Sequence, residues 1–281
     1  MTRSVKQYYT ANVKAEWARL GSDPYHKLEL DTTLAFLWKY LPRRGLILDA
    51  GGGPGRYAIE LAKAGYEVVL LDLSSANLAF AKKQVRKERV GLRVRELLQG
   101  SVTDLSAFSD NTFDAVVCLG GPLSHVLAES DRNRAIQELA RVAKDRAPVF
   151  ISVMSRLSVL ASELKYFQDE IELPTFRKIR DSGDYLGGRG FTACHFFLPE
   201  EFRNALLESK MLEVTEMVGL EGIGSNHREA VNKLAKNQRR WRVWLETHQE
   251  TATHPSVVGT SEHILAICRK ARLEKSLQKG F

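Results

Sequence analysis

The sequence is poor in the features that mark secreted, membrane and metal-binding proteins. It has only three cysteines in 281 residues, and Cys118, Cys194 and Cys268 lie far apart in the chain. Two of them fall in apolar runs, so buried free thiols are expected rather than disulfides or metal ligands. The histidines and cysteines do not have the spacing of a zinc site, and we predict no bound metal.

Long apolar runs are absent as well. No stretch is long enough to span a bilayer, and residues 1–9 lack the apolar core of a signal peptide. The sequence also has no internal repeat and no low-complexity tract. Its composition, 44% hydrophobic and 27% charged, is that of an ordinary globular protein. These properties fit a cytoplasmic enzyme with no membrane span.

The excess of positive charge is small. Lysine and arginine number 41 against 34 aspartates and glutamates, a difference of seven that would favour an anionic partner such as nucleic acid. Part of this excess lies in the last residues, at Arg269, Lys270, Arg272, Lys275 and Lys279. A solvated tail accounts for that part, so a nucleic-acid partner is not expected.

One stretch organises the rest of the sequence. A short apolar run at residues 46–48 predicts a buried strand, and Asp49 follows near its end. The chain then passes through a turn with three alternating glycines, Gly51, Gly53 and Gly55, into a helical pattern at residues 56–64. A strand, a glycine turn and a helix form a nucleotide-binding crossover. The glycines allow close approach of the backbone, and the helix N-terminus attracts a negative group.

The details of the turn favour one ligand class. A dinucleotide-binding turn requires Gly or Ala where this chain has Arg56, which is too large for close packing of the helix on the strand. The pattern from Asp49 to Gly55 is instead acidic-x-Gly-x-Gly-x-Gly. It resembles motif I of the class I S-adenosylmethionine-dependent methyltransferases. The resemblance is most specific over residues 40–155 and is to the small-molecule branch, similar in its core to quinone and sterol methyltransferases.

The resemblance agrees with the order of the predicted elements. Strands alternate with helices at regular spacing, which predicts a parallel sheet with right-handed crossovers. The resemblance implies an α/β, Rossmann-like, doubly wound and mostly parallel seven-stranded sheet with an antiparallel last strand. Predicted strands lie at 46–48, 67–71, 92–98, 111–119, 149–154, 211–218 and 262–268, and predicted helices include 5–20, 25–40, 56–64, 75–90, 131–143 and 199–209.

We expect one methyltransferase domain over residues 1–281. Residues 1–42 would form N-terminal lid helices, and residues 43–154 would form the cofactor-binding core. Residues 155–197 and 219–260 would be cap insertions, because long interruptions in a compact domain are usually lids or binding loops.

The cofactor site is predicted mostly from the resemblance. Asp72 lies about 20 residues beyond the glycine turn, where an acid binds ribose hydroxyls in this architecture. Ser101 stands where the family often has an acid that contacts adenine, and Asp104 is either a ligand or a turn cap. Tyr8 and Tyr9 are either lid contacts or packing residues of their helix. The predicted cofactor-binding residues are Asp49, Gly51, Gly53, Gly55, Asp72, Leu73, Ser101, Val102, Asp104, Leu119, Gly120, Tyr8 and Tyr9.

The implied reaction transfers a methyl group from S-adenosylmethionine to a small-molecule acceptor by in-line substitution and leaves S-adenosylhomocysteine. His125 follows the fourth strand and His195 lies in the first insertion, so both are candidate bases or acceptor contacts. A structural, hydrogen-bonded role is the alternative for each.

The acceptor is not readable from the sequence. Aromatic residues in the insertions suggest an apolar or flat molecule, although they could equally belong to the core. O-, N- and C-methylation remain open, as does the oligomeric state. One alternative is an RNA or protein methyltransferase that uses the basic segment 233–242. Another is a non-enzymatic binder or an NAD oxidoreductase on a related fold.

Overall fold

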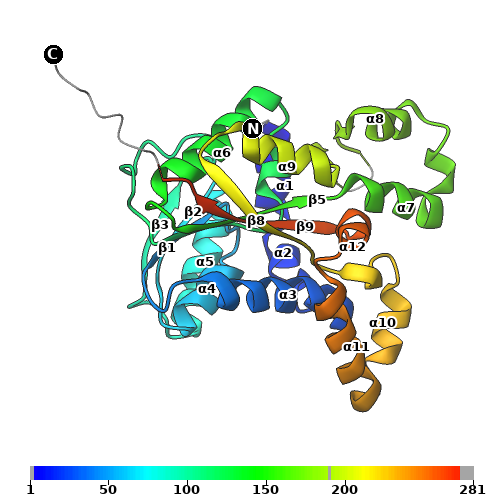
Figure 1. Cartoon of the computed structure of the whole chain (residues 1–281), viewed down its shortest axis with the longest axis horizontal. Coiled ribbons are helices and arrows are strands. Elements are labelled where there is room, and N and C mark those ends of the chain that lie inside the picture. Colours follow the sequence, from blue (N-terminus) through cyan, green and yellow to red (C-terminus); the bar gives the residue numbers. More distant parts are fainter. Residues whose placement is uncertain (1–2, 189–190, 273–281) are drawn as a thin grey trace.

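The computed structural model describes residues 3–188 and 191–272. A seven-stranded sheet forms the centre of the molecule, with helices on both faces (Figure 1). The strand order is β3-β2-β1-β4-β5-β9-β8; β9 pairs antiparallel with both β5 and β8, and the other pairs are parallel. The predicted Rossmann-like sheet with an antiparallel last strand is therefore confirmed. The strands are β1 (Leu46–Ala50), β2 (Glu67–Asp72), β3 (Val94–Gln99), β4 (Ala115–Cys118), β5 (Pro148–Met154), β8 (Leu212–Gly219) and β9 (His263–Lys270).

Alternate residues of each strand enter two separate cores, as the pleat of a strand requires. On one face Leu48, Val116 and Ile151 pack against α6 (Glu129–Val142) and α9 (Pro199–Glu208). On the other face Ile47 and Val117 pack against α3 (Pro24–Tyr40), α4 (Arg56–Lys63) and α5 (Ser75–Lys87). With both faces covered, the central strands read as continuous apolar runs.

The N-terminal helical region differs from the prediction. The sequence predicts one helix over residues 5–20, whereas the structure has α1 (Arg3–Ala11) and α2 (Val13–Arg19). The break lies at Asn12, whose side-chain amide donates a hydrogen bond of 2.9 Å to the carbonyl of Tyr8. Such local bonding by asparagine competes with regular helix geometry and frees α1 to take its own direction.

The two insertions contain most of the remaining elements. The first holds α7 (Arg156–Tyr166), η2 (Gln168–Glu170), α8 (Pro174–Ser182) and a hairpin of β6 (Asp184–Tyr185) and β7 (Cys194–His195). The second holds η3 (Gly222–Gly224), α10 (Arg228–Leu234), α11 (Gln238–Thr251) and α12 (Pro255–Thr260). The basic segment 233–242 is thus divided, since Asn237 caps α11 by accepting a hydrogen bond from the backbone N–H of Arg240.

Two further expectations can be compared with the structure. All three cysteines are free and buried, as predicted. None of the helices in the described part of the chain is long and apolar enough to cross a membrane.

Candidate functional site

The carboxyl ends of β1 and β4 form the edge of the sheet where a ligand would bind. These strands are neighbours, yet the chain continues from β1 to β2 on one side and from β4 to β5 on the other. Such a switch in direction opens a crevice between the connecting loops, and ligands of open α/β sheets occupy that crevice.

The turn after β1 allows a ligand to approach the backbone closely. Gly51, Gly53 and Gly55 have φ angles of 78°, 56° and 87°, in the region that L-residues rarely adopt. A Cβ at Gly51 would lie 2.7 Å from the ring of Pro122 in the loop after β4. A side chain at this position would push the two loops of the crevice apart, so glycine is needed here.

Asp72 ends β2 beside this turn and fixes its conformation. Its carboxylate accepts hydrogen bonds from the backbone N–H of Gly53 (2.9 Å) and Ser74 (2.8 Å) and from the amide of Asn77 (3.1 Å). Burial raises the pKa of Asp72, and these three donors act in the opposite direction. Oδ1 accepts two of these bonds and Oδ2 accepts one, so the remaining lone pair of Oδ2 can accept a further bond from a ligand's hydroxyl group.

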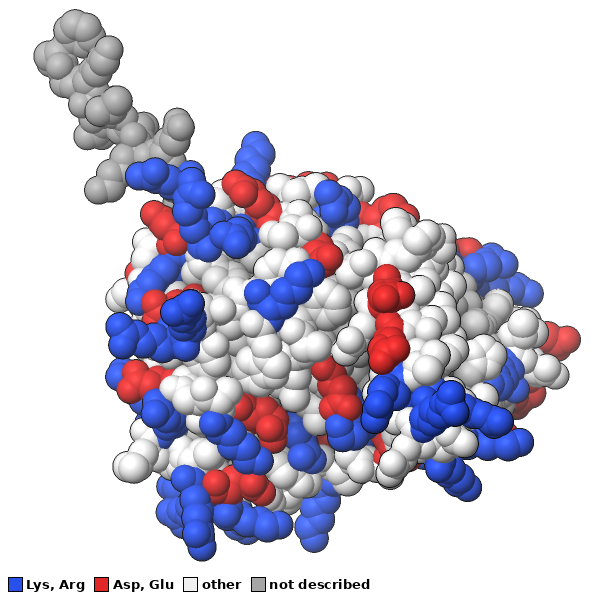
Figure 2. Space-filling model, turned by 60° about the horizontal axis from the view of Figure 1, so that its bottom comes forward, with Lys and Arg blue, Asp and Glu red and all other residues white. Residues whose placement is uncertain are grey.

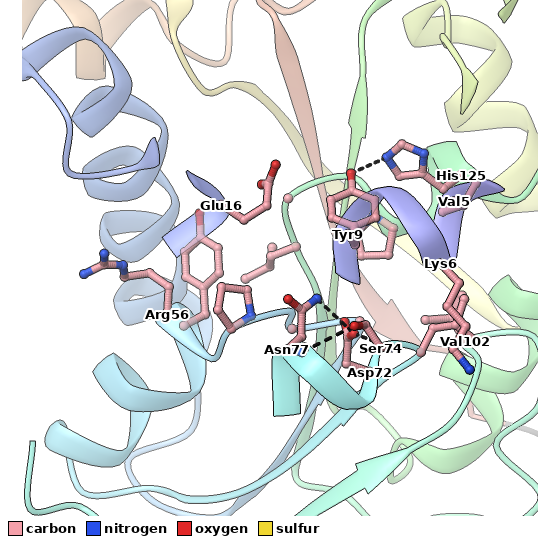
Figure 3. A pocket seen from close by; sticks show the side chains of 18 of the residues that line it. Val5, Lys6, Tyr9, Glu16, Arg56, Asp72, Ser74, Asn77, Val102 and His125 are labelled. Atoms are coloured by element: carbon pink, nitrogen blue, oxygen red, sulfur yellow. Dashed lines mark hydrogen bonds between the residues drawn. The ribbon is translucent and has the colours of Figure 1, made fainter. Parts of the chain in front are cut away.

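A cavity lies over this edge, between the sheet and the N-terminal helices (Figure 3). The structure brings together here predicted residues that are up to 116 positions apart in sequence. The predicted residues that line the cavity are Tyr9, Gly51, Asp72, Leu73, Ser101, Val102, Leu119, Gly120 and His125.

Other predicted residues do not line this cavity. Gly53 and Gly55 belong to the glycine turn but are not part of the cavity lining. Tyr8 packs edge-on against Phe191, with ring centroids 5.6 Å apart. Asp104 is exposed, and its carboxylate accepts a hydrogen bond of 3.1 Å from the N–H of Ser106. Of the two roles left open for Asp104, the geometry matches the turn cap.

Asp49 lies beneath the glycine turn and not in the cavity wall. Its side chain is fully buried, and neither oxygen has a hydrogen-bond partner within 3.5 Å among residues 3–188 and 191–272. Burial raises its pKa to about 7. An ionised acid at this depth is costly for folding, although the backbone N–H of Ala58 acts to lower its pKa, and the cofactor role predicted for Asp49 stays a prediction.

Tyr9 and His125 form a hydrogen-bonded pair on the cavity wall (Figure 3). Tyr9 comes from α1, and His125 ends the short helix η1 (Pro122–His125) after β4. The Tyr9 hydroxyl lies 2.6 Å from Nε2 of His125, and Nδ1 lies 3.0 Å from the carbonyl of Ala193. Burial lowers the pKa of His125 to about 4, so the ring is neutral at physiological pH.

His195 has a different environment, outside the cavity lining. Its Nδ1 lies 2.8 Å from Asp184 and its Nε2 lies 2.6 Å from Glu201, which also pairs with Arg156 at 2.6 Å. A carboxylate thus lies at hydrogen-bond distance from each ring nitrogen. The geometry therefore favours the structural alternative for His195, as a link between the hairpin and α9.

The prediction missed several cavity residues, among them Lys6, Glu16, Arg19 and Tyr57. Glu16 and Arg19 lie 3.7 Å apart on α2. From sequence alone, an acid and a base three residues apart on an amphipathic helix are assigned to its solvent-exposed face. Their place at the cavity becomes visible only in the structure, because it depends on where α2 lies relative to the crevice. The hydroxyl of Tyr57 is buried and has no hydrogen-bond partner within 3.5 Å in the described chain.

Comparison with known proteins gives consistent results for the core. Residues 47–146 match the family model of a methyltransferase domain. Over 105 residues the chain is 34% identical to a glycine/sarcosine N-methyltransferase of Halorhodospira halochloris, covering 37% of this chain and 38% of that protein. Over 110 residues it is 34% identical to a ubiquinone biosynthesis O-methyltransferase of Alkalilimnicola ehrlichii, covering 39% and 42%. The chain spans about half or less of the length of the curated relatives it matches.

The likeness to solved structures extends over most of the chain. A SAM-dependent methyltransferase of Methanosarcina mazei superposes with a TM-score of 0.57 at 20% identity, over 85% of this chain and 98% of that one. At this identity the likeness shows the fold, and it includes parts of the chain beyond the sequence match.

Proposed function

We propose that this protein transfers a methyl group from S-adenosylmethionine to a small-molecule acceptor, because residues 47–146 match a methyltransferase domain and the fold is that of a SAM-dependent methyltransferase. The observation that carries the proposal is the meeting of the glycine turn with Asp72. Asp72 ends β2 beside the switch point, and the N–H of Gly53 holds its carboxylate against the turn. The acid for a ribose and the backbone of Gly51 for the rest of the nucleoside therefore share one cavity wall.

The residues present fit this cofactor. Asp72 would hold the ribose hydroxyls, and Ser101 and Val102 would border the adenine. The amino-acid end carries one positive and one negative charge, and the opposite charges of Glu16 and Arg19 at the cavity wall complement them. The buried Tyr57 hydroxyl, with no partner of its own in the described chain, would donate to the same end.

The bound cofactor would supply a methyl group already activated by a positively charged sulfur. The task of the chain is then alignment and the exclusion of water, which together can supply about 7–11 kcal/mol of a barrier. Leu119 and Gly120 border the cavity where β4 ends, and α1 covers it. A Cβ at Gly120 would meet nothing within 4 Å, so the wall is open at the point where an acceptor would enter.

Three observations support a small-molecule acceptor. The two relatives described above are named for glycine and sarcosine and for ubiquinone biosynthesis. The rings of Tyr8, Tyr9 and Phe191 gather around His125, which suits a flat or apolar molecule. On the face of the molecule shown in Figure 2, lysine and arginine are mixed with aspartate and glutamate, whereas an RNA acceptor would call for a continuous basic tract.

Calorimetry with S-adenosylhomocysteine tests the proposal. We expect binding by the wild type and a dissociation constant about 10- to 100-fold higher for Asp72→Asn, because a neutral amide accepts weaker hydrogen bonds from the ribose than a carboxylate does. Asp31→Ala is the matched control, since Asp31 pairs with Lys27 on the exposed side of α3. Absence of heat with folded wild-type protein would refute the proposal, and equal affinity of wild type and Asp72→Asn would refute the role of Asp72.

A further inference from the structure

The hydrogen bonds of His125 define which nitrogen carries its proton. A carbonyl oxygen only accepts, so Nδ1 donates to Ala193 at 3.0 Å. In the neutral ring Nε2 then has a free lone pair, and at 2.6 Å it accepts the hydroxyl proton of Tyr9. The phenol oxygen of Tyr9 still has lone pairs of its own. Because Tyr9 lines the cavity, a ligand can donate a hydrogen bond to that oxygen.

The position of the pair suits the end of the cavity where chemistry would occur. Figure 3 places Tyr9 and His125 on the side away from the Asp72, Ser74 and Asn77 group. His125 follows β4 and belongs to the same cavity wall as Leu119 and Gly120. If the ribose binds at Asp72, the opposite side of the cavity, which contains the phenol oxygen of Tyr9, remains free to bind the acceptor.

We propose that Tyr9 and His125 form a proton relay that serves an acceptor with a hydroxyl group, so that this enzyme is an O-methyltransferase. The proposal rests on the proposed function. As the acceptor oxygen forms its bond to the methyl carbon, the carbon–sulfur bond breaks and its electron pair stays on sulfur. The hydroxyl proton of the acceptor passes to the Tyr9 oxygen, and the Tyr9 proton passes to Nε2 of His125. One positive charge thus moves from sulfur to the imidazole, where the carbonyl of Ala193 stabilises it.

The chemistry of the base separates oxygen from nitrogen acceptors. An oxygen that gains a methyl before losing its proton becomes a very strong acid, so even a weak base removes the proton. A methylated aliphatic amine keeps its proton well above neutral pH. A hydroxyl acceptor must therefore pass its proton to a group in the site, and the Tyr9 oxygen with the lone pair of Nε2 of His125 behind it is placed to take that proton. A neutral amine attacks through a free lone pair and its product can leave as an ammonium ion, so a relay at the cavity wall favours a hydroxyl acceptor.

The relay also depends on the position of α1. Tyr9 belongs to that helix, and Thr10, the next residue, lies 3.0 Å from the hydroxyl of Ser74 at the start of α5. Both contacts join α1 to the rim of the cavity. The relay therefore depends on α1 lying in this position, where the helix also keeps water from the activated methyl group.

Two measurements test the relay. In the first, nitrogen NMR of the S-adenosylhomocysteine complex at pH 7 reports the tautomer of His125, and we expect a proton on Nδ1 and none on Nε2. In the second, the protein is incubated with methyl-¹³C-labelled S-adenosylmethionine and a library of phenols, alcohols, primary and secondary amines and thiols. We expect ¹³C shifts of O-methyl products only.

The variant Tyr9→Phe removes the hydroxyl and keeps the ring. It should lower kcat about 100-fold or more and leave the affinity for S-adenosylhomocysteine unchanged. Tyr40→Phe is the control, since that hydroxyl bonds to Glu216 at 2.6 Å, outside the cavity. A proton on Nε2 or an unchanged kcat in Tyr9→Phe would overturn the relay. N-methyl products, or no product from any hydroxyl compound, would overturn the acceptor class. Wild-type protein that fails to bind S-adenosylhomocysteine would instead refute the proposed function.

Discussion

Asp49 is a buried carboxyl group whose protonation changes near neutral pH. Burial raises its pKa to about 7, while the N–H of Ala58 lowers it and the nearby Asp72 raises it. In an unfolded chain the pKa of aspartate is about 3.9. Between these two values the folded protein binds the proton and the unfolded chain does not. The free energy of unfolding therefore falls as the pH rises from about 4 to about 7.

The variant Asp49→Asn should remove this pH dependence. At pH 8 it should be more stable than the wild type, by at most about 4 kcal/mol, and at pH 4 the two should be nearly equal. Urea unfolding at both pH values measures the difference. Calorimetry with S-adenosylhomocysteine on the same samples then shows whether Asp49 also binds the cofactor. If it does, Asp49→Asn should bind S-adenosylhomocysteine more weakly although it is the more stable protein. A wild type that is the more stable protein at pH 8 would contradict the raised pKa.

Residue types at this site could be predicted better than side-chain directions. The motif predicts an acid at Asp49 and the spacing beyond the turn predicts one at Asp72, yet only Asp72 lines the cavity. The difference depends on how far each strand extends relative to the turn, which is set by packing between strands and not by local sequence. Arg19 was missed for a related reason, since its place in the cavity depends on the break at Asn12 and the path of α2.

At the scale of elements, the hairpin of β6 and β7 connects the first insertion to the site. Ala193 gives its carbonyl to His125, and Phe191 packs against the same ring, with centroids 5.7 Å apart. His195 holds the hairpin in place through Asp184 on one side and Glu201 on the other. The length of the first insertion allowed the prediction that it forms a cap. Its attachment through His195 could not be predicted, because the two acids that contact this histidine come together only in the folded chain.

The variant His195→Gln should loosen this hairpin and leave the sheet intact. Glutamine cannot donate to both carboxylates in the same geometry, so at least one charge-assisted hydrogen bond is lost. Hydrogen exchange measures the effect at the amides of Phe196 and Phe197, which donate to Gly183 and Met154. We expect exchange about tenfold faster or more there, and no change in β1. The exposed His227 gives the control variant His227→Gln, and equal exchange in both variants would contradict the proposed link.

For the molecule as a whole, a buried charge cluster joins the two ends of the chain. Arg19 of α2 pairs with Glu29 of α3, and His263 at the start of β9 pairs with Glu221 at 2.7 Å. Nδ1 of His263 lies 3.7 Å from Glu29, which connects the two pairs. The oxygens of Glu221 also accept from Ser261 at 2.9 Å. Each base of the cluster thus pairs with an acid, and the predicted absence of metal stays a prediction.

The cluster should set the pH range in which the whole protein is most stable. Burial lowers the pKa of His263, but Glu29 and Glu221 outweigh burial and raise it to about 9. Since histidine in an unfolded chain titrates near 6.5, the stabilisation is complete below about pH 6.5 and is lost as the pH rises through 9. Arg19 and His263 lower the pKa of Glu29 to about 2 against the effect of burial, so its contribution is lost only as the pH falls below about 4.5.

Thermal unfolding of wild type and His263→Gln from pH 5 to pH 10 tests this. The wild type should lose up to about 3 kcal/mol between pH 6.5 and 9 through this one group, and the variant should lack that loss. The variant should also be less stable at pH 6, because its neutral amide leaves the charges of Glu29 and Glu221 opposed by Arg19 alone. His254→Gln, at an exposed helix cap, controls for the loss of a histidine elsewhere. Parallel pH curves for wild type and His263→Gln would show that the cluster does not control stability and that the N-terminal helices are held to β9 by apolar packing.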